Sequence, residues 1–380
     1  MKILTIIGAR PQIIKAAAIS RAIKNKFSDQ IKEIILHTGQ HYDENMSAIF
    51  FNELSIPSPD YIFSLTGKSP DDQMTEMCEG IADTLSRENP DVILVYGDTN
   101  STYAGAKIAS QYRIPLVHVE AGLRSWNHEM PEERNRVYAD SVSTLLFSPT
   151  ITGYKNLVNE GFPENNNPPY HSKNPKIFHC GDVMLDNSLH FSFLADLQTN
   201  ILQKYQLTVE GFILATVHRN TNTDHPEKLN AIFRALLKIA KEWKVVLPIH
   251  PRTKKMMQQL LEEDVKADME RQQNLIIVPP VSFLEMISLE KNCKLVITDS
   301  GGVQKEAFYF KKPCLVLREE TEWVELVECG AAILAGNSDP EKIFSSYCRF
   351  INNPPGDFPS YYGDGDAASF VCEAILNYLS

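Results

Sequence analysis

Short, continuous apolar runs alternate with longer stretches of helical periodicity along nearly the whole chain. In the first half, the apolar runs are "KILTIIG", "EIILHTG", "VILVYGD", "IPLVHVEAG" and "TLLFSPT". Strands of a parallel sheet that carries helices on both faces are apolar on both sides, because neither face meets water. The pattern therefore predicts parallel strands joined by helices, the first of which spans residues 12–24.

The same alternation starts again after an irregular segment. Residues 161–176, "GFPENNNPPYHSKNPK", are rich in Pro and Asn, and the Pro-Pro pair excludes regular helix. The later apolar runs are "FILATVH", "VVLPIH", "LIIVPP", "KLVITDS", "PCLVL" and "AAILAG". We predict an α/β protein of two doubly wound, Rossmann-like domains facing a cleft. The domains are residues 1–181 and 182–364, and a last helix, residues 365–380, packs back toward the first domain.

Composition and charge narrow the class of protein. A chain of 380 residues, 43% of them hydrophobic, is larger than one typical core, which supports two domains. A net charge of −11 disfavours nucleic acid or an anionic membrane surface as a partner. No apolar run approaches the ~18 residues of a membrane span, and "MKILTIIGARPQ" lacks a signal-peptide cleavage site. We therefore expect a cytoplasmic protein.

The sequence predicts neither a metal nor a cofactor. The seven cysteines contain no CxxC pair, and the histidines show no metal-ligand spacing. Free, buried thiols in a reducing compartment are the expected state. The first strand ends in "GARPQ" instead of the GxGxxG fingerprint of dinucleotide-binding folds, so NAD is not expected.

Ligands of open parallel sheets bind beyond the carboxyl ends of the strands, so polar residues at those ends are site candidates. After the first strand, Arg10 stands where a cation can meet a phosphate, and Lys15 follows about one turn later. After the second strand, Gln40 and His41 are able to donate to a sugar or a phosphate. Solvated charges and loop capping are the alternative roles for these four residues.

Carboxylates mark the next two strand ends. Asp98 follows "VILVYG", and Glu120 follows "IPLVHV". Glu132 and Glu133 lie in the first turn of a helix opened by Pro131, where the helix dipole favours acidic residues and is a sufficient explanation for Glu133. An N-cap role for Asp98 and simple ion pairing of a carboxylate are the alternatives. The arginines available for pairing are Arg124, Arg134 and Arg136.

The second half supplies positive charge and a candidate phosphate site. The basic residues that follow two of its strands are His218, Arg219, His250 and Arg252. "TDSGGVQKEA" places Ser300, Gly301 and Gly302 between a strand and a helix, where free N–H groups and close approach favour an anion. Glu306 lies one turn farther along and can accept from two ribose hydroxyls. A plain tight turn is the alternative.

Cations and a phosphate cradle in one half, with carboxylates in the other, suit a diphosphate joined to a polyol, as in a nucleotide sugar. The chain resembles the non-hydrolysing UDP-N-acetylglucosamine 2-epimerases nearly from end to end. The motifs are "GARPQ", "TGQHYDENM", "YGDTNST", "HVEAGLRS", "MPEERNR", "LATVHR", "DSGGVQKEA" and "TEWVELVECG". The resemblance implies a glycosyltransferase-B-like fold, a UDP-sugar substrate and a homodimer.

The resemblance also implies reversible C2 epimerisation. UDP leaves C1 as the C2 proton is removed, which gives a 2-acetamidoglucal, and UDP then adds back with a proton delivered to the opposite face of C2. Acid and base groups are needed on both faces of the ring, and like-charged neighbours keep one carboxyl protonated. By motif matching, these carboxylates are Asp98, Glu120 and Glu132.

The binding roles come from the same motif matching. His218, Arg10 and the turn Ser300–Gly302 hold the diphosphate and stabilise the leaving group. Glu306 holds the ribose, and Lys15 is a further cleft residue. The remaining substrate-binding candidates are Gln40, His41, Arg136, Arg219, His250 and Arg252.

Three stretches depart from the family pattern. Thr221 stands where many relatives have Glu, "HPRT" replaces "HxNP", and "TEWVE" replaces "TERPE". The last two recur in a subgroup acting on UDP-2,3-diacetamido-2,3-dideoxy-glucuronate, and Arg252 suits a uronate carboxylate. UDP-N-acetylglucosamine is the expected substrate, with the diacetamido-uronate as the alternative. A hydrolysing epimerase that releases UDP and a glycosyltransferase of the same fold are further alternatives.

Overall fold

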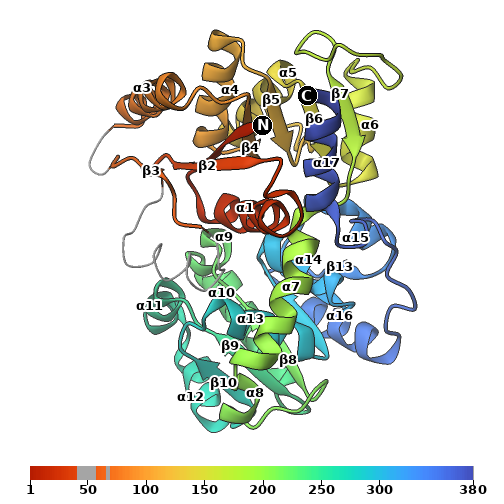
Figure 1. The fold of residues 1–380 in the computed structure, drawn as a ribbon. Helices are drawn as coiled ribbons and strands as arrows, with labels where there is room; N and C mark the ends of the chain where they lie inside the picture. The colour runs from red at the N-terminus through yellow and green to blue at the C-terminus, as the bar shows by residue number, and fades with distance from the viewer. Residues whose placement is uncertain (41–56, 66–68, 380) are drawn as a thin grey trace. The chain divides into compact units, whose positions relative to one another are not determined.

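The computed structural model describes residues 1–40, 57–65 and 69–379 of the chain. The chain divides into two compact units, Met1–Leu189 with Ser360–Ser380, and His190–Pro359 (Figure 1). The sequence predicts a boundary at 181/182, whereas this division falls inside the helix α7 (Val183–Gln198). A boundary inside a continuous helix leaves no Pro- or Gly-rich signal in the sequence at that point.

The described residues of the first unit build a seven-stranded sheet with the order β3-β2-β1-β4-β5-β6-β7, and every neighbouring pair is parallel. The strands are β1 (Lys2–Ile7), β2 (Lys32–His37), β3 (Tyr61–Ile62), β4 (Val92–Tyr96), β5 (Leu116–Val119), β6 (Leu145–Ser148) and β7 (Lys176–His179). The two edge strands, β3 and β7, are absent from the predicted set, because their partly exposed residues interrupt the apolar pattern.

Helices cover both faces of this sheet. Leu4 and Ile6 pack into a cluster with side chains of α3 and α4, while Ile3 and Ile7, which alternate with them, are equally buried. The helices are α1 (Arg10–Ala22), continued by the π-helical turn η1 (Ile23–Phe27), then α3 (Pro70–Glu88), α4 (Asn100–Tyr112), α5 (Pro131–Val142) and α6 (Ile151–Asn159). The helix predicted over 12–24 therefore begins earlier, because Pro11 fits the first helical turn.

The last helix, α17 (Ala367–Leu379), belongs to the first unit and packs against α1. Asp186 accepts hydrogen bonds from the backbone N–H groups of Ala367 and Ala368, at 3.2 and 2.7 Å. These are two of the N–H groups that the start of a helix leaves unpaired. Burial raises the pKa of Asp186 to about 6, against the opposing effect of these hydrogen bonds.

The second unit is built on a six-stranded parallel sheet with the order β10-β9-β8-β11-β12-β13. The strands are β8 (Phe212–Thr216), β9 (Lys244–Pro248), β10 (Leu275–Val278), β11 (Leu295–Thr298), β12 (Cys314–Val316) and β13 (Ala332–Leu334). The helices are α8 (Ile201–Lys204), α9 (Asn220–Thr223), α10 (Pro226–Ile239), α11 (Pro251–Leu260), α12 (Glu263–Arg271), α13 (Phe283–Asn292), α14 (Gly301–Tyr309), α15 (Val324–Glu328) and α16 (Pro340–Asn352). All six strands coincide with predicted apolar runs.

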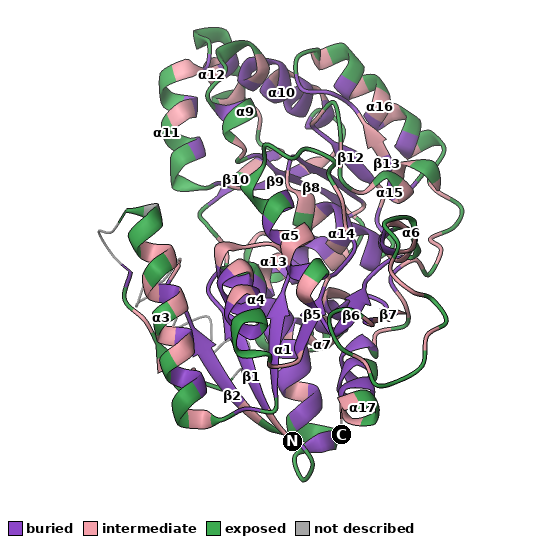
Figure 2. Cartoon of the chain, turned by 90° about the horizontal axis from the view of Figure 1, so that it is seen from above, coloured by how far each residue is buried: buried purple, intermediate pink, exposed green. Residues whose placement is uncertain are grey.

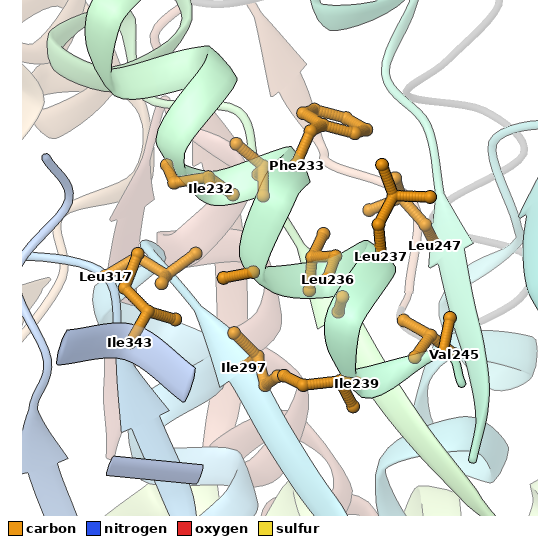
Figure 3. Close-up of a cluster of buried hydrophobic side chains, with 14 of the residues drawn as sticks. Ile232, Phe233, Leu236, Leu237, Ile239, Val245, Leu247, Ile297, Leu317 and Ile343 are labelled. Carbon is orange, nitrogen blue, oxygen red and sulfur yellow. The ribbon is translucent and has the colours of Figure 1, made fainter. Parts of the chain in front are cut away.

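The core of the second unit gathers around α10. Its apolar residues recur at helical spacing and face β9, β11 and α16; the residues labelled in Figure 3 are Ile232, Phe233, Leu236, Leu237, Ile239, Val245, Leu247, Ile297, Leu317 and Ile343. Figure 2 shows that the central strands are mostly buried, whereas many helices are buried on one side and exposed on the other. Within the described ranges, every helix is too short or too polar to cross a bilayer.

Candidate active site

The order of the strands reverses between β1 and β4 in the first unit and between β8 and β11 in the second. Open parallel sheets bind ligands at such a switch point, because the loops that follow the two strands lead away from each other. The loops after β4 and β5 carry Asp98 and Glu120. The loops after β8 and β11 carry His218 and Ser300.

Glu120 forms an ion pair with Lys15 in the first unit. Lys15 Nζ donates to Glu120 Oε1 at 2.7 Å, and the two side chains are only 11% and 12% exposed. Glu120 has a φ of 74°, a left-handed conformation that is strained for a side chain of this kind and that clusters at functional sites. Ion pairing, the alternative role for this carboxylate, is therefore observed for Glu120. Its partner, Lys15, is itself a predicted site residue.

Asp98 lies beside this pair and contacts Arg136. The Arg136 guanidinium pairs with Asp98 through Nη2 and donates from Nη1 to Glu133 Oε2 at 2.7 Å. Burial raises the pKa of Asp98; Arg136 opposes the shift, and the charges of Glu120 and Glu132 add to it. The N-cap role is excluded for Asp98, since the cap of α4 is the neighbouring residue, Thr99.

Glu133 makes specific hydrogen bonds in addition to its favourable position in the first turn of α5. This buried carboxylate accepts from Ser125 N at 2.9 Å, Ser125 Oγ at 3.0 Å and Trp126 N at 3.3 Å. Burial acts to raise the pKa of Glu133, but the hydrogen bonds from Ser125 and the Arg136 charge lower it below its ordinary value. Glu133 therefore stays ionised and anchors the loop before α5, whereas Glu132 is exposed.

A buried network joins the loops that carry the two carboxylates. His118 Nε2 lies 2.7 Å from the carbonyl oxygen of Gly97, and its Nδ1 lies 2.7 Å from Asp140 Oδ1. Asp140 Oδ2 accepts from Gly122 N at 3.1 Å and pairs with Arg124 Nη1 at 2.7 Å. Because Gly97 precedes Asp98 and Gly122 follows Glu120, the network fixes both strand ends. Arg124 thus neutralises Asp140 and not a candidate catalytic group.

The loop after β1 is shaped by Gln12, which is almost fully buried. Gln12 Oε1 accepts from Gly8 N at 2.9 Å and Ala9 N at 3.1 Å. Its Nε2 donates to the Tyr96 carbonyl at 2.9 Å and to a hydroxyl of α4, Thr102 Oγ1, at 3.0 Å. All of its amide hydrogen-bonding capacity is used, which fixes the turn that leads into Arg10, an exposed residue at the start of α1.

Of the two residues predicted after β2, the structure describes Gln40. Gln40 Oε1 accepts from Ser101 Oγ at 2.8 Å and from Ser101 N at 3.2 Å, so its carbonyl supports the start of α4. Loop capping, the alternative role, is therefore observed for Gln40. His41 lies outside the described residues.

Asp299 organises the loops at the switch point of the second unit. This fully buried carboxylate accepts from the backbone N–H groups of His218 and Arg219, at 3.1 and 3.0 Å. It also accepts from Asn222 Nδ2 at 3.0 Å, and its other oxygen lies 3.1 Å from His218 Nδ1. The imidazole of His218 is thus oriented from behind while half of its side chain remains exposed.

The Ser300–Gly302 turn opens α14 as the sequence predicts. Ser300 Oγ caps the helix at Val303 N, 3.5 Å away. A side chain at Gly301 would come within 2.1 Å of Glu322 Oε1, whereas the nearest atom to a Cβ at Gly302 is Ser300 Oγ, 4.0 Å away. Nothing in the described protein therefore requires glycine at position 302 for space, which is consistent with close approach of a ligand.

The "TEWVE" stretch supports this turn. Trp323 Nε1 donates to the Gly301 carbonyl at 3.0 Å, and Lys305 Nζ lies 4.3 Å from the centre of the Trp323 ring. Glu322 pairs with Arg318 at 2.9 Å and approaches Arg219 at 4.0 Å. The "TEWVE" stretch thus holds the first glycine of the candidate phosphate site.

His250 and Arg252 have partners inside the second unit. His250 Nδ1 accepts from Arg252 N at 3.3 Å at the start of α11. Arg252 Nη2 lies 2.7 and 2.5 Å from the two carboxylate oxygens of Asp224. The pair is solvent-exposed, and exposed ion pairs are weak, so a ligand carboxylate can compete with Asp224.

Comparison with known proteins decides the family. The protein-family model described as UDP-N-acetylglucosamine 2-epimerase matches residues 23–376. This chain belongs to the UDP-N-acetylglucosamine 2-epimerase family. Its relatives include the UDP-2,3-diacetamido-2,3-dideoxy-D-glucuronate 2-epimerase of Pseudomonas aeruginosa, which is 46% identical over 376 residues, 99% of each chain.

Solved structures of UDP-GlcNAc 2-epimerases share the fold over the entire chain. The enzyme from Methanocaldococcus jannaschii is 35% identical, with a TM-score of 0.84 and 100% of both chains covered. A structure of the M. jannaschii enzyme in complex with UDP-GlcNAc and UDP has 37% identity, a TM-score of 0.81 and the same coverage. These findings confirm the glycosyltransferase-B-like α/β fold and the isomerase class expected for a UDP-N-acetylglucosamine 2-epimerase.

Within this epimerase, the fold brings some of the predicted residues of each unit into contact. Lys15 meets Glu120, Arg136 meets Asp98, and Arg219 lies beside the turn at Ser300. The supporting residues were not recognised from the sequence; they are Gln12, His118, Asp140 and Asp299. The available signal was a polar side chain next to or inside an apolar strand, as in "LVHV" and "LVITD".

Proposed function

We propose that this chain catalyses reversible C2 epimerisation of a UDP-2-acetamido sugar, converting UDP-N-acetylglucosamine to UDP-N-acetylmannosamine. The observation that carries the proposal is the pair of carboxylates at neighbouring strand ends, which lie in different surroundings. Glu120 is paired with Lys15, whereas Asp98 is paired with Arg136 and burial raises its pKa. Carboxyl groups in different surroundings are suited to act as base and acid.

The chemistry follows from the substrate. The C2 proton is not adjacent to a carbonyl, so elimination is the accessible route. A carboxylate takes the C2 proton, the C–H electrons form the C1=C2 double bond, and the C1–O bond breaks with its electrons on UDP. UDP then attacks C1 of the 2-acetamidoglucal, and a carboxylic acid protonates C2 on the opposite face. Atoms and electrons balance without an external oxidant or reductant.

The remaining candidates bind the nucleotide in this proposal. Asp98, Glu120 and Glu132 are the acid and base groups. His218, Arg219 and the Ser300–Gly302 turn at the start of α14 neutralise the diphosphate, with Arg10, as the leaving group gains charge. Support comes from the buried Asp299, which orients the His218–Arg219 loop. Glu306 accepts from the ribose hydroxyls.

We further infer a cytoplasmic homodimer. The support is the family resemblance together with the cysteines, all seven of which are free thiols. Free thiols suit a reducing compartment.

Incubation with UDP-N-acetylglucosamine in deuterated water tests the reaction. We expect the manno epimer to appear with deuterium at C2, without added NAD, and with UDP still attached. Epimerisation that leaves C2 unlabelled would contradict the mechanism. Free N-acetylmannosamine and UDP as the only products would indicate the hydrolysing reaction instead, and turnover only with an added acceptor would indicate a glycosyltransferase.

The same chemistry on UDP-2,3-diacetamido-2,3-dideoxy-glucuronate is the second candidate. It is favoured by the relative that is 46% identical and named for that substrate, and by Arg252, which suits a uronate. A kcat/KM panel with both UDP-sugars separates the two candidates. Arg252→Gln should lower kcat/KM for the uronate about tenfold or more and leave the value for UDP-N-acetylglucosamine nearly unchanged if the uronate is the substrate.

A further inference from the structure

Glu290 is a buried carboxyl that the chemistry above does not use. It lies on α13, which packs against α14, the helix that begins at the candidate phosphate site. The residue is 0% exposed. Within the described part of the chain, neither of its carboxyl oxygens meets an N–H or O–H donor. An ionised carboxylate buried in this way is strongly disfavoured.

The carboxyl of Glu290 faces the carboxyl of Glu306 on α14. Burial and the Glu306 charge both raise the pKa of Glu290 well above its ordinary value. The other titratable groups that interact electrostatically with Glu290 are the thiols of Cys293 and Cys314. Both thiols are buried, and burial raises the pKa of both, that of Cys293 to about 12. These thiols are neutral at physiological pH and cannot compensate a negative charge. Lys312, which acts on Cys293, is already paired with Glu210 at 3.1 Å.

We propose that Glu290 is a positioning residue that, as a neutral carboxylic acid, donates its O–H to the Glu306 carboxylate and orients it toward the two hydroxyls of a ribose. Two adjacent carboxyl groups cannot both ionise at low cost, so one of them keeps its proton. The fully buried carboxyl, Glu290, is the one that keeps it, because burial disfavours the charged form. A carboxylate has about four acceptor positions. One hydrogen bond from Glu290 therefore occupies only one of these positions on Glu306.

This inference rests on the proposed function, because the ribose is that of a UDP-sugar. It goes beyond that function in assigning a role to a residue outside the proposed acid–base and nucleotide-binding groups. Glu306 is only partly buried, and a charge-assisted hydrogen bond from a fixed neighbour limits its side-chain freedom before the ligand arrives.

The test compares Glu290→Gln with Glu290→Met by titration calorimetry with UDP and with 2′-deoxy-UDP. Both replacements keep the length of the side chain, but only Gln keeps a donor. We expect Glu290→Met to weaken UDP binding about tenfold, the effect of one lost charge-assisted hydrogen bond. Its effect on the deoxy analogue should be much smaller, because one ribose contact is already missing. Glu290→Gln should restore most of the affinity for UDP.

A double-mutant cycle adds a second readout. In a Glu306→Ala background, Glu290→Met should cause no further loss of UDP affinity, since residues that act through one contact are not additive. Leu289→Ala, which is buried on the same helix, is the matched control. It should lower the melting temperature without changing the ratio of UDP to 2′-deoxy-UDP affinity.

The outcomes separate this inference from the proposed function. Unchanged UDP binding by Glu290→Met, or equal losses for UDP and its deoxy analogue, overturns the inference alone. A wild-type protein that does not bind UDP overturns the proposed function as well. If Glu290→Met does not fold, infrared spectroscopy decides. The C=O band of a protonated carboxylic acid should be present in the wild type at neutral pH and lost in Glu290→Gln, and its absence from the wild type overturns the inference.

Discussion

Asp98, Glu120 and Glu133, three carboxylates of the first unit, have different hydrogen-bonding and ion-pair partners. Glu120 has a lysine partner, and Glu133 is committed to backbone donors of the loop before α5. Asp98 has an arginine partner, yet burial still raises its pKa. The three carboxylates therefore stand in three different surroundings, as the proposed acid–base chemistry requires of Asp98 and Glu120.

Asp98→Asn removes one of the proposed acid–base groups while keeping the shape of the side chain. We expect kcat to fall by about 10²–10⁴-fold, the usual contribution of a general acid or base. UDP affinity should change by less than about threefold, because the nucleotide is bound mainly by the second unit in our proposal. Steady-state kinetics and titration with UDP measure the two effects. Asp83→Asn, an exposed carboxylate on α3, is the matched control and should leave both unchanged.

The glycines at 301 and 302 give a second prediction at this scale. Gly302→Ala should weaken UDP binding about tenfold and leave the melting temperature unchanged, since an added Cβ meets open space in the described protein and only a ligand would contact it. Gly301→Ala should instead displace Glu322 and disturb its pairs with Arg219 and Arg318. Calorimetry and thermal unfolding distinguish the variants; UDP affinity unchanged in Gly302→Ala would remove this turn from the phosphate site.

At the scale of the element, the strand ends are fixed by side chains from other segments. His118, inside β5, links the loop after β4 to α5 through Gly97 and Asp140. Asp186, in the first turn of α7, links that helix to the start of α17. Both links hold together segments far apart in the sequence.

His118→Phe should destabilise the protein by about 3 kcal/mol, because it leaves the Asp140 carboxylate and the Gly97 carbonyl buried with a partner missing. It should also lower kcat through the displaced Asp98. Urea unfolding and kinetics measure these effects. The double variant with Asp140→Asn should cost clearly less than the sum of the single variants; full additivity would show that the two side chains act independently.

Asp186 makes stability depend on pH. Its pKa of about 6 lies above the ordinary 3.8, so its protonated form is favoured in the folded state. That contribution is complete below about pH 4 and is lost as the pH rises through about 6, for a change of up to about 3 kcal/mol. Asp186→Asn should remove this part of the dependence. The measurement is the free energy of unfolding at pH 4.5 and 7.5, and equal slopes in wild type and variant would contradict the assignment.

At the scale of the whole molecule, two parallel sheets of the same architecture each place polar groups at a switch point. Among the described residues, the first unit carries carboxylates at its switch point, and the second unit carries a helix start and cations. In our proposal, the carboxylates serve the acid–base reaction at the sugar, and the helix start and cations bind the charged leaving group.

Saturation with UDP should stabilise the whole chain. At a concentration about 100 times Kd, a ligand that binds only the folded state adds about 2.7 kcal/mol to the free energy of unfolding. We expect a higher melting temperature with UDP and a smaller increase at the same UDP concentration in Gly302→Ala. No increase in the wild type would contradict nucleotide binding.

By itself, the sequence determined the fold class and the family. Apolar runs bounded by polar motifs identify central strands, because a doubly covered sheet tolerates few polar residues. The order and spacing of the motifs then indicate the family. The edge strands β3 and β7 escaped this reasoning, since partly exposed strands need not be apolar.

Only the tertiary structure decided which polar groups meet. Whether Asp98 is an N-cap, whether Arg124 neutralises Glu120, and what Asp299 and His118 hold are all questions of distance between segments remote in sequence. Hydrogen bonds and ion pairs act over a few ångströms, and the fold alone sets those distances. The burial that raises the pKa of Asp98 and Glu290 likewise comes from packing around them, which the local sequence does not encode.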